Sequence, residues 1–190
     1  MANRSYLYAS NEVPTADRTP AERDMIGIAE WNYDIPIAFK LLLSGNPQPC
    51  NSSIWKCPEQ IAIAGDYEAG FERLSDFLNR ISNVDARPLA SEADAFLRSE
   101  KNRRRFFVLE CGEIFEMHDQ PLLEQNEALI HSILNLEAEE KTTREKVSVS
   151  MPAGPSSRHG KRVVRPIDRL GLGNWSNTLY FDLNPQRKIS

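Results

Sequence analysis

The sequence predicts a single α+β domain over residues 1–190, with a mostly antiparallel central sheet flanked by three or four helices. Strand and helix patterns follow one another without the regular rhythm of βαβ units, which favours α+β over a parallel α/β fold. The chain has 190 residues, of which 41% are hydrophobic and 26% are charged. This composition is typical of one globular domain, and no internal repeat is visible.

The first elements are a strand, a loop and a helix. Residues 5–9 alternate two tyrosines with smaller side chains, as in a strand with one buried face. Residues 11–19 contain turn-forming residues and predict a loop. Residues 35–44 then predict a helix, with Asp34 as its N-terminal cap and Gly45 as its stop.

A loop with three prolines over residues 46–58 precedes a short apolar strand at 61–65. Apolar residues recur at steps of three and four from Tyr67 to Ile81 and predict an amphipathic helix. Asp66 directly precedes this helix and is predicted to cap it. Ser91–Asp94 resembles a capping box and predicts the start of a second helix.

Residues 106–109 predict a buried strand, whereas Ile114–Phe115 fit either a hairpin strand or a helix. Residues 121–136 carry leucines and isoleucines at helical spacing and predict a long helix. The alternation over Val147–Met151 predicts a strand. The predicted sheet consists of strands near Tyr6, Ile63, Phe107, Val149 and Tyr180.

The segment after residue 151 is rich in turn-forming residues. Two prolines, two glycines and two serines at about 152–160 predict a mobile loop. Gly171 and Gly173 predict a turn with positive φ, because the match of residues 171–176 to a dinucleotide-binding fingerprint is only partial. Residues 178–183 predict the last strand.

The cysteine count and hydropathy predict a cytoplasmic protein. Three cysteines are an odd number and do not suggest a disulfide framework. The first eleven residues lack the apolar core of a signal peptide, and no apolar run approaches the ~20 residues of a membrane span.

Charge is segregated along the chain. Residues 106–140 hold nine acidic residues and no lysine or arginine, whereas residues 141–190 hold ten basic residues and three acidic ones. One interpretation is the solvated face of an amphipathic helix. The other is an acidic surface that docks a basic protein partner. The acidic residues assigned to that surface are Glu113, Glu116, Asp119, Glu124, Glu127, Glu137 and Glu139.

Three tryptophans extend the candidate partner-binding set. Trp31, Trp55 and Trp175 lie near proline, glycine or asparagine, outside long apolar runs. If the three side chains are exposed together, they mark a binding surface. If they are instead mostly buried, they cover the edge of the hydrophobic core. Nucleic acid is disfavoured as a partner, because the net charge is −4 and the basic segment lacks interleaved aromatic residues.

Signatures of catalysis are absent from the sequence. It contains no phosphate-binding G-x-x-x-x-G-K-[ST] loop, no H-E-x-x-H motif and no G-x-S-x-G elbow. We therefore assign no catalytic residue, metal or cofactor. An alternative is a small hydrolase or transferase with a thiol or carboxylate site near Cys111–Asp119, which requires Cys111, His118 and an acid to meet in one pocket. A further alternative is ligand sensing through exposed tryptophans.

Three segments resemble an uncharacterised family of bacterial proteins. They are MANRSYLY at the start, EWNYDIP at residues 30–36, and GLGNWSN at residues 171–177. In size, acidity and lack of catalytic signatures the chain is also similar to bacterial immunity proteins, which bind and neutralise a cognate toxin. That resemblance implies a non-enzymatic module whose partner is a basic toxin domain.

Overall fold

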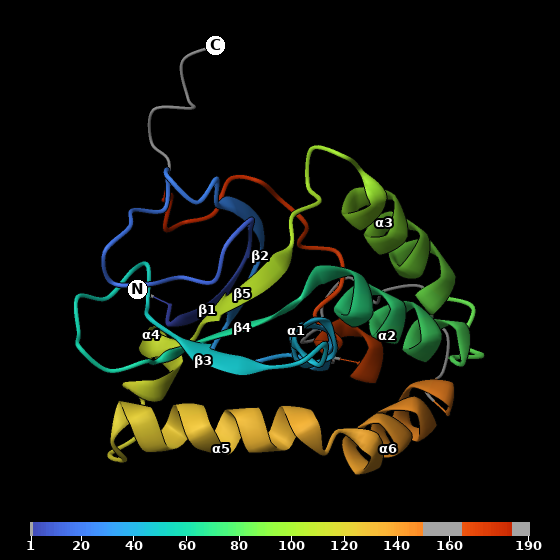
Figure 1. The fold of residues 1–190 in the computed structure, drawn as a ribbon. Helices are drawn as coiled ribbons and strands as arrows, with labels where there is room; N and C mark the ends of the chain where they lie inside the picture. Colours follow the sequence, from blue (N-terminus) through green and yellow to red (C-terminus); the bar gives the residue numbers. More distant parts are fainter. Residues whose placement is uncertain (1, 150–164, 184–190) are drawn as a thin grey trace.

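The structure is a computed structural model that describes residues 2–149 and 165–183 (Figure 1). Its central feature is a five-stranded sheet of order β2-β1-β5-β4-β3, in which every neighbouring pair is antiparallel. The strands are β1 (Arg4–Ser10), β2 (Ile26–Asn32), β3 (Gln48–Cys50), β4 (Ala62–Asp66) and β5 (Phe106–Glu110). The helices are α1 (Ile37–Leu43), α2 (Tyr67–Asn79), α3 (Ala86–Arg98), α4 (Gly112–Phe115), α5 (Leu122–Leu134), α6 (Glu137–Ser148) and the 3-10 helix η1 (Pro166–Arg169). The single α+β domain with an antiparallel sheet is as predicted.

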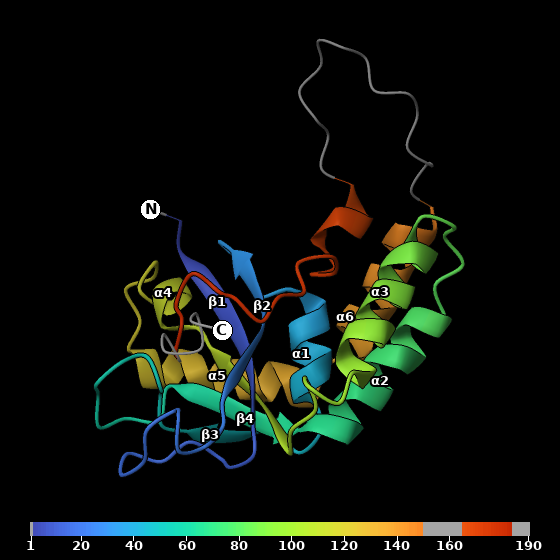
Figure 2. The ribbon, with the colours of Figure 1, turned by 90° about the horizontal axis from the view of Figure 1, so that it is seen from above.

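The two faces of the sheet carry different layers. Successive side chains of a strand point to opposite faces, so Leu7 and Ala9 of β1 join one core and Tyr6 and Tyr8 join the other. The larger core lies beneath the helices, and each described helix contributes at least one buried residue to it. The smaller core lies beneath loops and the C-terminal segment (Figures 1 and 2).

Helix α1 fits tightly between the sheet and α2. A Cβ at Gly70 of α2 would overlap the carbonyl oxygen of Leu42 in α1. Glycine at this position therefore lets the backbones of α1 and α2 come into contact. Helices α5 and α6 follow one another along the lower side of the domain in Figure 1.

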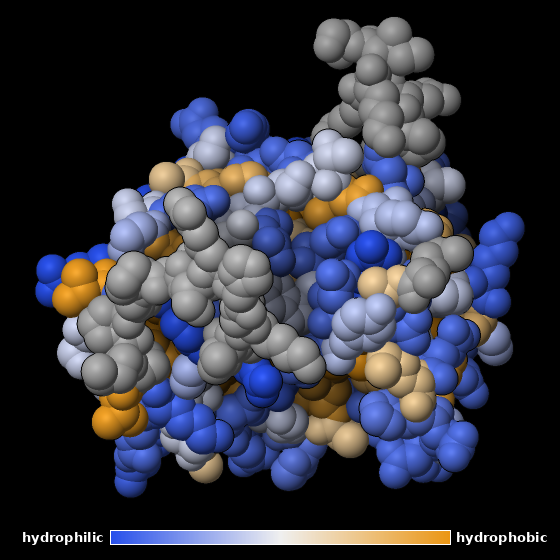
Figure 3. Space-filling view, turned by 180° about the vertical axis from the view of Figure 1, so that it is seen from behind, coloured by the Kyte–Doolittle hydropathy of each residue, from blue (hydrophilic) through white to orange (hydrophobic). Residues whose placement is uncertain are grey.

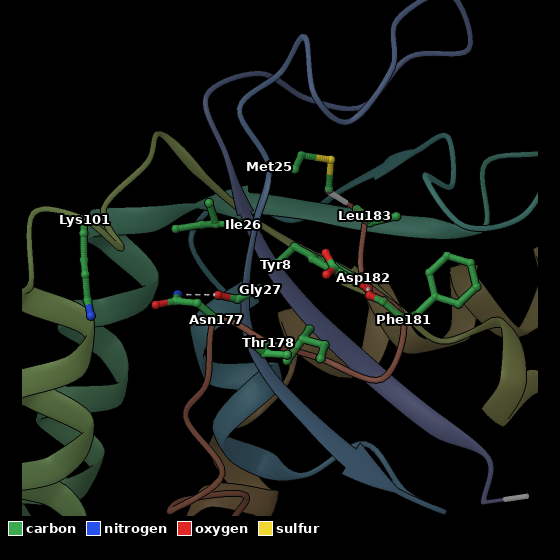
Figure 4. Close-up of a pocket in the computed structure, with 11 residues that line it drawn as sticks. Tyr8, Met25, Ile26, Gly27, Lys101, Asn177, Thr178, Phe181, Asp182 and Leu183 are labelled. Atoms are coloured by element: carbon green, nitrogen blue, oxygen red, sulfur yellow. Dashed lines mark hydrogen bonds between the residues drawn. The ribbon is translucent and has the colours of Figure 1, made fainter. Parts of the chain in front are cut away.

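The C-terminal residues 175–183 cross the second face of the sheet as a strap. The backbone N–H of Ser176 donates to the carbonyl of Ile28 at 3.0 Å. Asn177 Nδ2 donates to the carbonyl of Gly27 at 2.8 Å, and the Tyr8 hydroxyl donates to the carbonyl of Phe181 at 2.7 Å. The strap lines a cavity of about 320 Å³ together with Tyr8 and Met25. Figure 4 shows side chains of the strap and of the sheet around this cavity.

Three of the five predicted strands are confirmed, as β1, β4 and β5. The predicted strand at 147–151 is wrong over its described part, because α6 runs to Ser148 and Val147 is its one fully buried apolar residue. The predicted strand at 178–183 is also wrong: its segment is irregular, and the nearby isolated bridge joins Ala29 to Trp175. The strands missed are β2, and β3 inside the predicted 46–58 loop.

Several helix ends differ from the predictions. Helix α1 begins after Pro36, which is its N-cap, and Asp34 Oδ1 instead accepts from the N–H of Ile35. Helix α3 begins at Ala86, so the predicted capping box at Ser91 lies inside the helix. Ile114–Phe115 is helical. The long helices predicted after Asp66 and Pro121 are confirmed as α2 and α5.

Gly171 and Gly173 have φ of +85° and +86°, as the turn prediction required. The predicted mobile loop at about 152–160 lies outside the described residues.

Candidate partner-binding surface

Helix α5 is held to the sheet by two buried amide side chains. Asn126 Nδ2 donates to the carbonyls of Gln60 and Ala62, at 2.9 and 3.2 Å. Gln125 Nε2 donates to the carbonyls of Phe115 and Gln120, at 3.0 and 2.7 Å. These bonds, together with buried Leu129 and Ile133, fix which side of α5 faces outward.

The outward side of α5 carries unpaired acids. Glu124, Glu127, His131 and Leu134 recur at helical spacing and are all exposed. Exposed acids also precede and follow this helix. Together they form what we call the acidic face, which consists of Glu116, Asp119, Glu124, Glu127 and Glu137. None of the five forms an ion pair with another described residue.

Two acids that the sequence assigned to this surface are engaged inside the domain. Glu113 accepts from the Tyr6 hydroxyl and from the backbone N–H of Arg4, both at 2.8 Å. Glu139 forms an ion pair of 3.0 Å with Lys40. Their partners lie about a hundred residues away along the chain, so sequence spacing gave no signal of these pairings.

Exposed apolar side chains accompany the acidic face. Met117 is 47% exposed and follows Glu116, and Leu134 is 59% exposed on the outward side of α5. Large apolar side chains in such positions supply contact area at protein interfaces. Figure 3 shows the molecule from behind, where the coloured residues are mainly hydrophilic and the apolar ones form small separate areas.

The three tryptophans have separate packing partners within the domain. All are partly buried. Trp31 and Trp175 pack against the larger core, and the Trp175 ring stacks on Phe96 with centroids 6.0 Å apart. The Trp55 indole lies against Gly112 at the start of α4. This packing is what the core-closing interpretation of the tryptophans expects.

The thiol arrangement required by the enzyme alternative is not assembled. Cys111 is 2% exposed and belongs to the larger core, and burial raises the pKa of its thiol well above the ordinary value. His118 is exposed in the turn before α5. A protonated, enclosed thiol is a poor nucleophile. Among the described residues, no group of three histidine, cysteine or acidic side chains is arranged to hold a metal ion.

Sequence reasoning missed a buried polar network on the second face of the sheet. Glu110 at the end of β5 is 1% exposed. Its carboxyl accepts from the Ser52 hydroxyl and from the Ser53 backbone N–H, both at 2.6 Å. Burial raises the pKa of Glu110 to about 7, against the opposing effect of these bonds and of Arg23. The one sequence signal is a glutamate that continues an apolar strand.

Arg23 belongs to the same network and is 2% exposed. Its backbone carbonyl accepts from the N–H of Asn11 at 3.2 Å, which places Arg23 where the loop between β1 and β2 returns to the sheet. Asp24 follows with a positive φ of 52° and turns the chain into β2.

Fold and surface define an α+β domain with helices on one face of an antiparallel sheet and an unpaired acidic face on α4–α6. The chain belongs to the family described as Domain of unknown function (DUF7822), which matches residues 11–150. The matched range includes EWNYDIP and the acidic face, and it excludes MANRSYLY and GLGNWSN. No curated protein and no solved structure gives a significant match to the chain. Within the described residues, no helix combines the length and apolarity needed to cross a bilayer.

Proposed function

We propose that this protein is a non-enzymatic binding module whose acidic face docks a basic protein partner. The observation that carries the proposal is that the acidic residues between positions 113 and 139 differ in whether they have a partner within the domain. Glu113 and Glu139 have partners within the domain, whereas the five acids of the acidic face have none among the described residues. Unpaired charges of one sign attract an oppositely charged partner and accelerate its association.

The helix macrodipole explains part of the acidic face without any partner. Glu124 and Glu137 lie in the first turns of α5 and α6, where a carboxylate stabilises the helix. Glu127 lies beyond the first turn of α5, and Glu116 follows the end of α4. These two residues therefore provide the cleaner test of docking, because changing them leaves both helix N-termini intact.

The most concrete form of the proposal is a bacterial immunity protein. Such a protein occludes the active site of a cognate toxin, and toxins that act on nucleic acid need basic surfaces to bind phosphate. The acidic face would compete with nucleic acid for that basic surface. Met117 and Leu134 would supply apolar contacts within the same interface. This function requires no catalytic group, metal or cofactor.

The test is capture of a partner from a lysate of the source organism with three forms of the chain. They are the intact protein, a face variant (Glu116→Lys with Glu127→Lys), and a control variant (Glu92→Lys with Glu100→Lys). The control makes the same change in charge at exposed positions on and just after α3.

The intact and control forms are expected to retain a basic protein that the face variant loses. The captured protein should be toxic when produced alone in a host, and co-production of the intact chain should restore growth. A partner that the face variant retains, or whose toxicity the chain leaves unchanged, would contradict the proposal.

A further inference from the structure

A cleft of about 390 Å³ opens between the loop at residues 11–25 and the loop at residues 51–60. The two loops lie side by side (Figures 1 and 2), and the N–H of Asn51 donates to the carbonyl of Pro14 at 3.3 Å. This volume lies at the lower end of the roughly 300–1,000 Å³ of small-molecule sites. The lining carries cations and neutral polar groups but no acidic residue; it includes Arg18, Arg23, Asn51, Ser53, Trp55 and Lys56.

Arg23 is a buried cation without a carboxylate partner. Buried charges in proteins are normally paired. Yet Arg23 forms no ion pair with another described residue, and Glu110 reaches it only through the longer-range attraction of opposite charges. Burial lowers the pKa of Arg23, as expected for a cation that is incompletely compensated.

The donors of Arg23 are only partly used. Nη1 donates to the carbonyl of Thr15 at 2.9 Å, and Nη2 donates to the Ser53 hydroxyl at 3.3 Å. Nε is buried and has no hydrogen-bond partner among the described residues. An unsatisfied buried donor on a charged group is costly, and an acceptor that reached this nitrogen would remove that cost.

Ser53 adds a second available donor. Its hydroxyl accepts from Arg23, and its own hydrogen faces only the thioether sulfur of Met25, at 3.3 Å. A thioether is a weak acceptor. Lys56 at the rim is exposed and forms no ion pair with a described residue, whereas Arg18 is already paired with Glu12.

Glu110 does not satisfy this set of donors. Ser52 and the backbone of Ser53 hold its carboxyl. Because burial raises its pKa to about 7, a substantial fraction of Glu110 is protonated at neutral pH. The region around Arg23 therefore keeps net positive charge.

We propose that this cleft binds the phosphoryl group of a small metabolite, with Arg23 and Ser53 at its base and Lys56 at its rim. A carboxylate is best recognised by two parallel donors of one guanidinium. The cleft instead spreads its donors and positive charge over Arg23, Ser53 and Lys56, and Thr15 and Ser53 each already accept one hydrogen bond from an Nη atom of Arg23. Single donors on separate residues instead suit a phosphoryl group, which offers three acceptor oxygens and up to two negative charges. The inference does not rest on the acidic face.

The test is calorimetric titration of the full chain at constant ionic strength with glucose 6-phosphate, inorganic phosphate, succinate and glucose. We expect saturable binding of at least one phosphate-bearing probe, weaker binding of succinate and none of glucose. Lys56→Ala and Ser53→Ala should each weaken binding about 3–30-fold, as expected for the loss of a donor to a charged acceptor. Ser53→Ala keeps the backbone N–H that binds Glu110.

Arg23→Met should abolish binding while nearly preserving side-chain length. If this variant does not fold, Ser53→Ala and Lys56→Ala decide the matter. Lys141→Ala on α6 is the matched control and should bind within twofold of the intact chain. Failure of both phosphate-bearing probes to saturate, succinate binding as tightly as they do, or equal weakening by Lys141→Ala would each overturn the proposal.

Discussion

Arg23 and Glu110 are buried on the same face of the sheet without forming an ion pair, and Ser53 contacts both. The Ser53 N–H donates to Glu110 at 2.6 Å, while the Ser53 hydroxyl accepts from Arg23 at 3.3 Å. This arrangement leaves the carboxyl desolvated and the guanidinium incompletely satisfied. Both consequences can be measured.

The first prediction concerns pH. The pKa of Glu110 is raised from 4.5 to about 7 in the folded chain. Its contribution to stability is therefore fully present below pH 4.5 and is lost as pH rises through 7. The loss amounts to roughly 3 kcal/mol at about 1.4 kcal/mol per pKa unit. Denaturant unfolding at several values between pH 4.5 and 8 measures it.

Glu110→Gln is the matched variant, because it resembles the protonated form and leaves the other facing groups in place. Those groups are Arg23, Tyr8 and three cysteines (Cys50, Cys57 and Cys111), and burial raises the pKa values of the tyrosine and of the three thiols, which keeps them neutral. Between pH 4.5 and 8, we expect the free energy of unfolding of the Gln variant to fall by roughly 3 kcal/mol less than that of the intact chain. Parallel pH profiles for the two proteins would show that Glu110 titrates normally.

The second prediction concerns the contact between α1 and α2. Gly70→Ala places a methyl group against the carbonyl oxygen of Leu42, which is backbone and cannot rotate away. We expect a loss of about 3 kcal/mol or more in the free energy of unfolding, as for overpacking against a rigid neighbour. Gly173→Ala is the control: its nearest neighbour is the Leu89 side chain at 3.4 Å, and only the positive φ opposes it. A similar, small loss for both variants would contradict the close approach.

The secondary-structure elements that could be predicted are those whose sequence pattern lies within the element itself. All five of the elements with a strong local pattern were predicted: the strand around Tyr6 from its alternation, the strands around Ile63 and Phe107 from their short apolar runs, and the helices α2 and α5 from their helical periodicity. Strand β3 has three residues, one of them proline, so it pairs only because β4 offers an edge. The Val–Ser alternation at the end of α6 imitates a strand, but the good helix formers before it extend the helix to Ser148.

The same distinction applies to the candidate site. That residues 106–140 are acidic could be read from the sequence. Which of those acids are free could not, because Lys40 and Tyr6 come from distant elements. Likewise, a lone arginine in a loop gives no sign that it will be buried without a counter-ion. Both features arise only when the chain packs.

The third prediction concerns the attachment of α6. Glu140 is 7% exposed, and Arg73 of α2 binds its Oε1 through Nε and Nη2 at 3.0 and 2.5 Å. Arg73→Ala leaves this carboxylate without its ion-pair partner. Because Arg73 is half exposed, we expect a moderate loss of about 1–2 kcal/mol in the free energy of unfolding. Arg87→Ala, at an exposed position of α3, should cost less than about 0.5 kcal/mol. Chemical unfolding measures the stability of both variants. Equal losses would show that the Arg73–Glu140 ion pair does not help to hold α6 to α2.

The acidic face is tested most directly by the association rate of the captured partner with the intact chain, measured at 50 and 300 mM NaCl. Steering by unpaired charges predicts a rate that falls about tenfold or more with added salt, because the Debye length shortens. The face variant should associate more slowly at low salt and depend less on salt, and the α3 control variant should match the intact chain. An association rate insensitive to salt, or equal for the intact chain and the face variant, would contradict docking through the acidic face.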